Sequence, residues 1–401
     1  MGEVRTKWLE SITRRNILRF FSSFVAGSPL LLHAQQDSLR FQDTKRVPGV
    51  NELVSSFDFE TVFRGNVSRA VSNYTAMGVD SEFTLRRNRE AFDWVQMISR
   101  GKGDILSVNT SSQVFGTLLE HPILIAPTSG HQLLHPGGEK ATYQGATATK
   151  TPFIVSNVSS QPIEEIAKAA NGPLWFQFYP KQDMDLSRRT LERAQTSGCE
   201  CIVITIDQQA SNFTRALHDR NLGGGRGRDY TRIRRRRTPP KNPYRVRDSR
   251  LWYEWGYLDQ IHPFIKVPML AKGVLSAEDA LRCLDYGLDG IIVSNHGGRS
   301  VDYAPSSLEV LSEIVDVVDG RIPVLIDGGF RRGSDILKAL ALGADAVCLG
   351  RVSRWGLGSY GAQGVQRVIE IMQAELVQAM ANVGQMDLTT LDRSVLRKDF
   401  P

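Results

Sequence analysis

The chain has 401 residues, of which 41% are hydrophobic and 23% are charged, and its formal net charge at neutral pH is +6. This composition is typical of a globular protein with a large core, and it excludes a disordered or collagen-like chain. The four cysteines show neither metal-site spacing nor a disulfide framework, so we expect buried free thiols and no metal site. No apolar run is long enough to span a membrane.

The N-terminal segment has the order of an export signal. Arg14 and Arg15 precede an apolar stretch at 20–32 and the small residue Ala34, as in a twin-arginine signal. The alternative is a short amphipathic helix, because the cleavage region lacks a clear small-x-small pattern. We predict an export signal over 1–34, a polar linker over 35–49 and one folded domain over 50–401, whose first helices, around 50–99, cover the rest.

Eight short apolar runs, each bounded by turn residues, predict eight buried strands. Six helical patterns lie between them, several opened by Ser, Thr or Asp and closed by Gly. This alternation favours a parallel sheet of the α/β class, and eight units predict a closed (β/α)8 TIM barrel. The strands are expected at Pro122–Ala126, Pro152–Val155, Leu174–Tyr179, Cys201–Ile206, Val267–Ala271, Gly290–Val293, Pro323–Ile326 and Ala346–Leu349. The helices are expected at Glu139–Thr149, Ile163–Ala169, Leu186–Thr196, Ala277–Tyr286, Ser307–Val317 and Gly333–Leu342.

His296 and Arg299 follow the strand at Gly290–Val293, where α/β folds place their chemistry. A histidine base and an arginine that can bind a carboxylate, three residues apart in the sequence, suggest proton abstraction from an anionic substrate. Capping of backbone groups is an equally open interpretation of these residues taken alone. Further polar residues end earlier strands and so predict one site at a common rim: Pro127, Thr128, Ser129, Ser156, Gln177, Tyr179, Thr205, Asp207 and Lys272.

Two later turns combine glycine with arginine. Gly328 and Gly329 precede Arg331 after one strand, and Gly350 precedes Arg351 after the next. Glycine lets a phosphate approach backbone N–H groups, and arginine binds a phosphate in a bidentate manner. The pair is similar to the phosphate site after the seventh and eighth strands of a TIM barrel.

These motifs, in this order, resemble the FMN-dependent 2-hydroxy-acid oxidoreductases, the family of glycolate oxidase, lactate oxidase and the flavin L-lactate and mandelate dehydrogenases. The resemblance runs from about Val50 to about Gly384 and implies noncovalent FMN and oxidation of an L-2-hydroxy acid to the 2-oxo acid. It is carried by Tyr74–Gly78, Ala126–Thr128, Phe176–Tyr179, Thr205–Asp207, Leu270–Gly273, Ser294–Arg299 and Asp327–Arg332.

The resemblance also implies a role for each site residue. His296 would be the base, and Asp207 would orient its ring and stabilise the imidazolium. Arg299 would hold the substrate carboxylate between Tyr74 and Tyr179. Lys272 would stabilise the reduced flavin. The flavin ring and ribityl chain would contact Pro127, Thr128, Ser129, Ser156, Gln177, Thr205, Lys272 and Ser294, and the ribityl and phosphate end would contact Asp327, Gly328, Gly329, Arg331, Gly350 and Arg351.

Three positions bear on the substrate pocket or on the neighbourhood of the flavin. Val158 stands where many members of the family have a tryptophan, and Ser129 stands where an alanine or glycine is usual. The absence of the aromatic ring should reshape the pocket. Arg215 matches the family's second substrate-binding arginine only if one residue is inserted after Asp207, and a solvated loop charge is its alternative interpretation.

Positive charge is concentrated at 226–250, which has ten arginines and one lysine against two aspartates. A solvated loop and a surface that docks on an anionic membrane or an acidic electron-acceptor protein remain equal interpretations. No nucleic-acid-binding motif accompanies the charge. Relatives imply a homo-oligomer, commonly a tetramer, whereas the acid and the electron acceptor (oxygen, quinone or cytochrome) stay open. The alternative functions are another FMN-barrel reaction, such as an isomerisation, and a non-catalytic surface-binding barrel.

Overall fold

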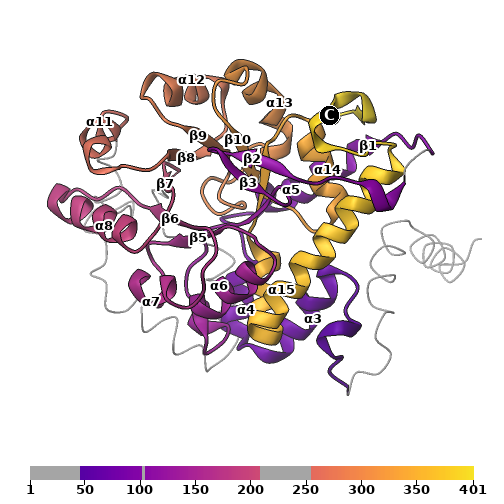
Figure 1. Cartoon of the computed structure of the whole chain (residues 1–401), viewed down its shortest axis with the longest axis horizontal. Coiled ribbons are helices and arrows are strands. Elements are labelled where there is room, and N and C mark those ends of the chain that lie inside the picture. The colour runs from indigo at the N-terminus through magenta and orange to yellow at the C-terminus, as the bar shows by residue number, and fades with distance from the viewer. Residues whose placement is uncertain (1–45, 102–103, 208–253) are drawn as a thin grey trace, which may run out of the picture. The chain divides into compact units, whose positions relative to one another are not determined.

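Eight parallel strands form a closed barrel in the order β4 to β11, and β11 pairs back onto β4 (Figure 1). The computed structural model describes residues 46–101, 104–207 and 254–401. The predicted (β/α)8 barrel is therefore confirmed. Its strands are β4 (Ile123–Ile125), β5 (Phe153–Ser156), β6 (Leu174–Phe178), β7 (Ile202–Thr205), β8 (Met269–Val274), β9 (Gly290–Val293), β10 (Val324–Asp327) and β11 (Ala346–Leu349).

Strand β8 departs from its expected range of Val267–Ala271. It begins later because Pro268 has no N–H group to donate to a neighbouring strand. It also ends later, since Lys272 still pairs with Thr205 on one side and Ile292 on the other before a bulge interrupts the ladder. Lys272 is thus fixed by two strands and does not belong to a turn.

The barrel strands are buried on both faces, which explains their continuous apolar sequences. One set of side chains fills the barrel interior, among them Leu124, Trp175 and Leu325. The other set packs under the surrounding helices. A hairpin that the sequence did not predict, β2 (Ser112–Val114) and β3 (Thr117–Leu119), adds Phe115 to the interior cluster, with its ring centroid 5.7 Å from that of Trp175.

The six expected helices are present with small shifts at their ends. Serine or aspartate side chains cap several of them, as Ser276 and Ser306 do by accepting from the backbone N–H of Asp279 and Glu309. The helices of the barrel are α6 (Gly138–Ala148), α7 (Ile163–Ala167), α8 (Met184–Thr196), α11 (Tyr257–Ile261), α12 (Ala277–Asp285), α13 (Ser307–Val318), α14 (Gly333–Ala341) and α15 (Arg351–Asn382).

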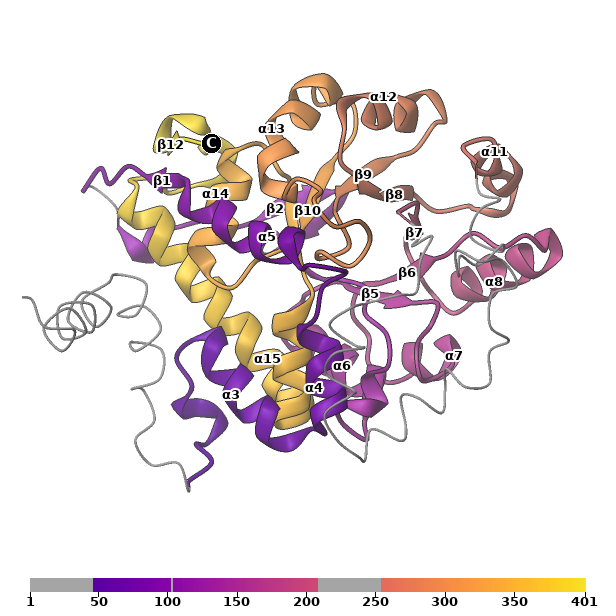
Figure 2. The same cartoon turned by 180° about the vertical axis from the view of Figure 1, so that it is seen from behind.

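Helix α15 is long and kinked at Tyr360 and Gly361; the sequence indicates that a helix can follow Arg351, but its bounds are not among the six expected ranges. Its many glycines oppose helix formation in isolation, so no strong helical pattern is visible in the sequence. They serve close packing instead: a Cβ on Gly364 would lie 2.0 Å from the carbonyl oxygen of Gly356. Figure 2 shows α15 beside α3 (Ser56–Asn66) and α4 (Arg69–Ala76), which pack against it.

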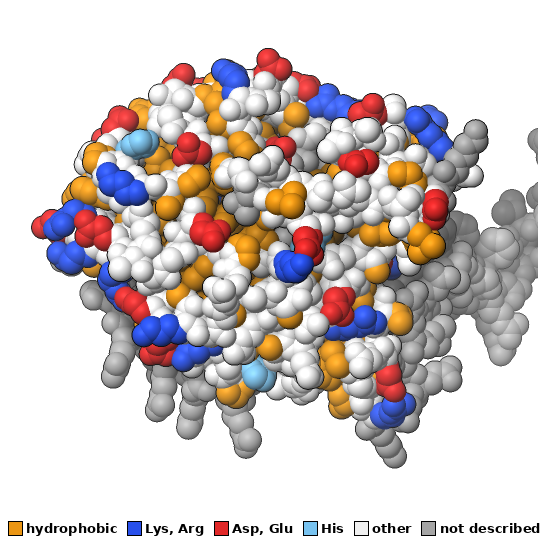
Figure 3. Space-filling model, viewed as in Figure 1, with side chains coloured by type: hydrophobic (Ala, Val, Ile, Leu, Met, Phe, Trp, Pro, Cys, Tyr) orange, Lys and Arg blue, Asp and Glu red, His pale blue; other side chains and the backbone are white. Residues whose placement is uncertain are grey.

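The N-terminal helices end with α5 (Phe83–Asp93), and strand β1 (Val95–Met97) then pairs antiparallel with β12 (Leu396–Lys398). These elements group with the barrel in a single unit over 50–401. No helix within the described ranges combines the length and apolarity needed to cross a bilayer. On the face shown in Figure 3, acidic and basic side chains are interspersed.

Candidate active site

The imidazole of His296 lies between side chains from two other strand ends. Its Nδ1 is 2.9 Å from Oδ1 of Asp207, which follows β7, and its Nε2 is 3.4 Å from the hydroxyl of Tyr179, which follows β6. An ionised aspartate can only accept, so Nδ1 carries the proton and Nε2 presents a lone pair toward Tyr179. The Asp207 side chain is 8% exposed and that of His296 24%, which leaves the ring accessible from the rim.

The backbone of His296 has φ of +59°, an uncommon left-handed value for a residue with a side chain. Its N–H donates to Ser294 Oγ over 3.0 Å, and the next two residues, both glycines, also have positive φ. The turn is anchored by Asn295, whose side-chain amide exchanges hydrogen bonds of 2.9 and 2.8 Å with that of Asn88 on α5. Such strain persists where the surroundings hold it, and it is common at active sites.

Arg299 reaches α4 from the same turn. One of its Nη atoms donates to the carbonyl oxygens of Tyr74 and Met77, at 2.9 and 3.0 Å. Its guanidinium carbon also lies 4.6 Å from the centroid of the Tyr74 ring. Two of the residues predicted to bind the substrate are therefore brought together.

Lys272 is a buried cation between two other predicted cofactor contacts. Its Nζ donates to Ser294 Oγ at 2.7 Å and lies 3.1 Å from Oδ2 of Asp327. Burial alone would lower its pKa, but the carboxylates of Asp327 and Asp207 outweigh burial and raise it. Lys272 is consequently a fixed positive charge at neutral pH.

Buried polar atoms along this rim fit a bound flavin. Gln177 accepts from Ser156 Oγ at 3.1 Å, yet its Nε2 has no hydrogen-bond partner among the described residues, and neither has Oδ1 of Asp327. Leaving a buried donor or acceptor unpaired costs about 1–3 kcal/mol. A ring system with carbonyl and N–H edges, joined to a hydroxylated chain, would supply the missing partners. The other predicted positions at this rim are Pro127, Thr128 and Ser129 after β4, Thr205 at the end of β7, and Gly328 and Gly329 after β10.

The predicted phosphate arginines lie in a cleft of about 460 Å³ together with Arg89, Gly329 and Trp355. Burial and neighbouring guanidinium groups lower the pKa of Arg331 and of Arg351. A guanidinium stays charged at neutral pH. An anion between them would relieve this repulsion, so the cleft suits a phosphate. Gly350 is placed at the start of α15, beside Arg351.

Sequence reasoning missed two buried side chains of the site, His131 and Arg354. His131 Nε2 is 2.7 Å from Thr128 Oγ1, and Arg354 donates to the carbonyl oxygen of Ser129 at 2.6 Å. The spacing of Arg351 and Arg354 would have placed both on one helical face, had the bounds of α15 been predicted.

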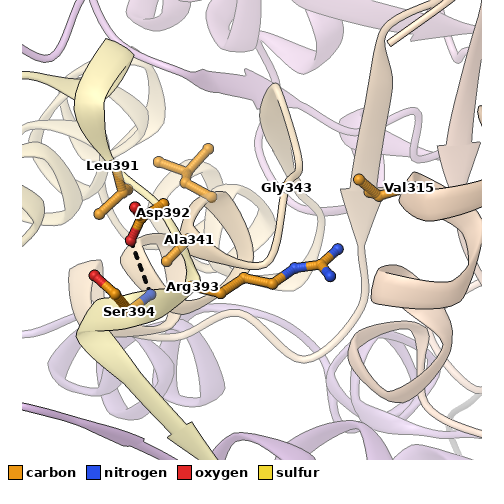
Figure 4. A pocket seen from close by; sticks show the side chains of 8 residues that line it. Val315, Ala341, Gly343, Leu391, Asp392, Arg393 and Ser394 are labelled. Atoms are coloured by element: carbon orange, nitrogen blue, oxygen red, sulfur yellow. Dashed lines mark hydrogen bonds between the residues drawn. The ribbon is translucent and has the colours of Figure 1, made fainter. Parts of the chain in front are cut away.

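Three predictions lie outside the described residues: Arg215, the basic segment at 226–250 and the export signal at 1–34. No group of three or more potential metal ligands lies close together within the described part of the chain. The four cysteines are buried and unpaired with each other. A second groove (Figure 4) lies between α13, α14 and residues 391–394. It lies at the end of the barrel where β10 and β11 begin, away from the rim that carries the predicted site residues.

Comparison with known proteins identifies the family of the chain. A family model described as FMN-dependent dehydrogenase matches residues 63–398. A peroxisomal (S)-2-hydroxyacid oxidase of Arabidopsis thaliana is 34% identical over 355 residues, which cover 87% of this chain and 98% of the relative. An L-lactate oxidase of Nostoc sp. is 34% identical over 365 residues, covering 86% and 99%.

Among solved structures, a mandelate oxidase with (S)-2-phenylpropionate superposes with a TM-score of 0.75 at 34% identity, covering 87% of this chain and 99% of that one. Its fold agrees with the barrel described above. The chain belongs to the FMN-dependent 2-hydroxy-acid oxidoreductase family, and its cofactor is FMN.

Proposed function

We propose that the chain oxidises an L-2-hydroxy acid to the corresponding 2-oxo acid. The observation that carries the proposal is the hydrogen bond from His296 Nδ1 to Asp207, which leaves Nε2 as a base facing Tyr179. The relatives include an (S)-2-hydroxyacid oxidase and an L-lactate oxidase, which supports this substrate class.

Each residue has a physical task in this proposal. Arg299 binds the substrate carboxylate through its guanidinium, with the Tyr74 ring stacked against it. His296 Nε2 accepts a proton from the substrate, and Asp207 stabilises the imidazolium that results. Bound FMN supplies the acceptor for the two electrons that leave the substrate. The buried charge of Lys272 favours the negative charge that accumulates beside it.

The test is anaerobic rapid mixing of the purified flavoprotein with glycolate, which is achiral, and with the separate L- and D-forms of lactate- and mandelate-like acids. Bleaching of the flavin by L-acids and not by D-acids supports the proposal, and each 2-oxo acid should appear in equal amount. Absence of bleaching with every 2-hydroxy acid would reject it. The His296→Gln variant should retain FMN, and its rate of flavin reduction should fall by about 10²- to 10⁴-fold.

For the electron acceptor, we infer a membrane-associated or acidic partner that docks on 226–250. The support is the sequence: ten arginines and one lysine in this range. Each basic residue near an anionic surface adds roughly 1 kcal/mol to binding. Cosedimentation with acidic vesicles at low and high salt, comparing the protein with a form in which 234–237 are serines, tests this. Salt-independent or absent binding would favour oxygen or a soluble carrier.

For the cellular location, we propose export by the twin-arginine route, supported by Arg14 and Arg15 before an apolar segment. Replacing both by lysine should retain the protein inside the cell, and N-terminal sequencing of exported protein should begin near residue 35. We also propose a homo-oligomer, which analytical ultracentrifugation measures directly.

A further inference from the structure

The segment 127–131, between β4 and α6, is anchored to α6 by its own last residue, the buried His131. His131 is 1% exposed, with Nε2 at 2.7 Å from Thr128 Oγ1 and Nδ1 at 2.9 Å from Thr142 Oγ1 of α6. The Thr142 hydroxyl also lies 3.4 Å from the carbonyl oxygen of Gly138, to which it donates. This second contact lets Thr142 accept from Nδ1–H of the histidine, which is the tautomer we assign to His131.

This arrangement determines the direction of the next hydrogen bond. With its proton on Nδ1, His131 can only accept at Nε2, so the Thr128 hydroxyl donates to it. The Thr128 oxygen then presents lone pairs alone to its other neighbours. Burial, and then the charge of Arg354, lower the pKa of His131 to about 3, so the ring stays neutral in this role.

The same segment is held from the other side by Arg354, in the first turn of α15. One Nη donates to the carbonyl oxygen of Ser129 at 2.6 Å, while Nε and the other Nη contact Thr75 Oγ1 at 3.3 and 3.2 Å. The guanidinium carbon is 5.9 Å from the centroid of the Tyr74 ring. Arg354 thus joins the 127–131 segment to α4.

Arg354 is 5% exposed, and burying a charge costs more free energy than burying an apolar side chain of similar size. Arg354 contacts two segments with different proposed tasks. Ser129 belongs to the predicted flavin contacts after β4 (residues 127–129, here called the flavin seat), and Thr75 adjoins the substrate-binding Tyr74. The guanidinium therefore connects these two segments directly.

We infer that His131 and Arg354 are positioning residues: His131 fixes the Thr128 hydroxyl as an acceptor toward FMN, and Arg354 couples the flavin seat to the substrate-binding helix α4. The inference rests on the proposed function for the tasks of Thr128, Ser129 and Tyr74. The isoalloxazine ring gains N–H groups on reduction, so an oxygen that only accepts favours the reduced form. Loss of this orientation should make the flavin midpoint potential more negative.

The test uses four variants of the full-length holoprotein: Arg354→Met, Arg354→Lys, His131→Phe and His131→Gln. Arg354→Met should weaken FMN binding to the apoprotein by about 10- to 100-fold, since a charge-assisted hydrogen bond is lost. It should also raise KM for the acid more than it lowers kcat. Arg354→Lys, which keeps the charge, should recover part of both. His131→Phe should shift the visible flavin spectrum and the midpoint potential, and His131→Gln should restore them in part.

Matched controls exist at the opposite end of the barrel and on its outer surface. His121 is buried before β4, with Nε2 2.8 Å from the carbonyl oxygen of Thr149. Arg282 lies 5.8 Å from the Trp255 ring centroid on α12. His121→Phe and Arg282→Met should change neither flavin spectrum nor potential.

Wild-type FMN affinity, spectrum and potential in Arg354→Met and His131→Phe would overturn the inference, as would equal shifts in the two controls. If Arg354→Met or His131→Phe does not fold, wild-type values in Arg354→Lys or His131→Gln would overturn it equally. FMN affinity and potential require no turnover. Failure of the wild-type protein to oxidise 2-hydroxy acids would therefore reject the proposed function while these readouts still decide the present inference.

Discussion

His296 and Asp207 meet across the barrel rim, 2.9 Å apart, although they are far apart in sequence and follow different strands. The contact selects the Nδ1–H tautomer and leaves Nε2 as the base. Ser300 holds the backbone of Asp207, because its hydroxyl donates to the Asp207 carbonyl oxygen at 2.8 Å. The base is thus oriented by a residue whose backbone is itself held in place.

Asp207→Asn should reverse this tautomer. The amide can donate to Nδ1, which moves the ring proton to Nε2 and removes the acceptor. We expect the rate of flavin reduction to fall by about 10²- to 10⁴-fold with FMN still bound. Anaerobic stopped-flow absorbance measures it. Asp302→Asn is the control, since Asp302 caps α5 by accepting from Ser81 N and Thr84 N and should leave the rate unchanged. Wild-type reduction by Asp207→Asn would remove Asp207 from the mechanism.

Gly298→Ala should destabilise the turn that carries His296. Gly298 has φ of +72°, and a Cβ there would lie 2.7 Å from backbone atoms of Leu85. Gly287 has a similar φ of +66° with nothing within 4 Å, so Gly287→Ala isolates the conformational cost. We expect about 1 kcal/mol of lost stability for Gly287→Ala and about 2–4 kcal/mol for Gly298→Ala. Urea unfolding of the holoproteins measures both, and equal losses would contradict the packing argument.

The barrel could be predicted because each of its strands is a short run of buried apolar residues, a pattern that depends on local sequence. The length and bounds of helix α15 could not, since Gly356 and Gly364 are selected by contact with each other and not by helix propensity. The same limit applies within the site. His296 and Lys272 follow apolar runs and are visible, whereas the task of His131 depends on Thr142 in another element.

The arginines of the cleft should recognise the phosphate of FMN specifically. Arg331→Ala removes a half-buried cation whose guanidinium carbon lies 4.6 Å from the Trp355 ring centroid. We expect FMN affinity to fall by about 10- to 100-fold, while affinity for riboflavin, which has no phosphate, changes little. Fluorescence titration of the apoprotein with both ligands gives the ratio. Arg193→Met, which breaks an exposed pair with Glu164, is the control. If Arg331→Ala lowers the affinity for FMN and for riboflavin equally, the phosphate of FMN does not bind at Arg331.

Acid should destabilise the protein partly through His131. Its pKa is lowered from 6.5 to about 3 in the fold, first by burial, so the unfolded chain binds a proton that the folded chain does not. This contribution to stability is present above pH 6.5 and is lost as the pH falls toward 3, by roughly 2 kcal/mol near pH 5. His131→Gln should therefore lose less stability than the wild type between pH 7 and 5, as measured by urea unfolding. Parallel losses would show that the histidine is not buried in its neutral form.

The side chain of Val158 should set the size of acid that is accepted. Val158 follows β5, its N–H donates to Ser156 Oγ at 3.2 Å, and its side chain is 50% exposed. By the resemblance to the family, a tryptophan at this position would line the substrate pocket. We expect Val158→Trp to lower kcat/KM for a mandelate-like acid by about 10- to 100-fold and to change that for glycolate much less, because steric exclusion acts on the larger side chain.

The measurement is the ratio of the two kcat/KM values, which cancels differences in flavin content between preparations. Val301→Trp is a suitable control, since Val301 is 63% exposed on the loop between β9 and α13. It adds the same bulk at another site on the rim. An unchanged ratio in Val158→Trp, or an equal change in Val301→Trp, would mean that the acid binds away from β5. The selectivity would then have to come from α4, where Tyr74 and Arg299 meet.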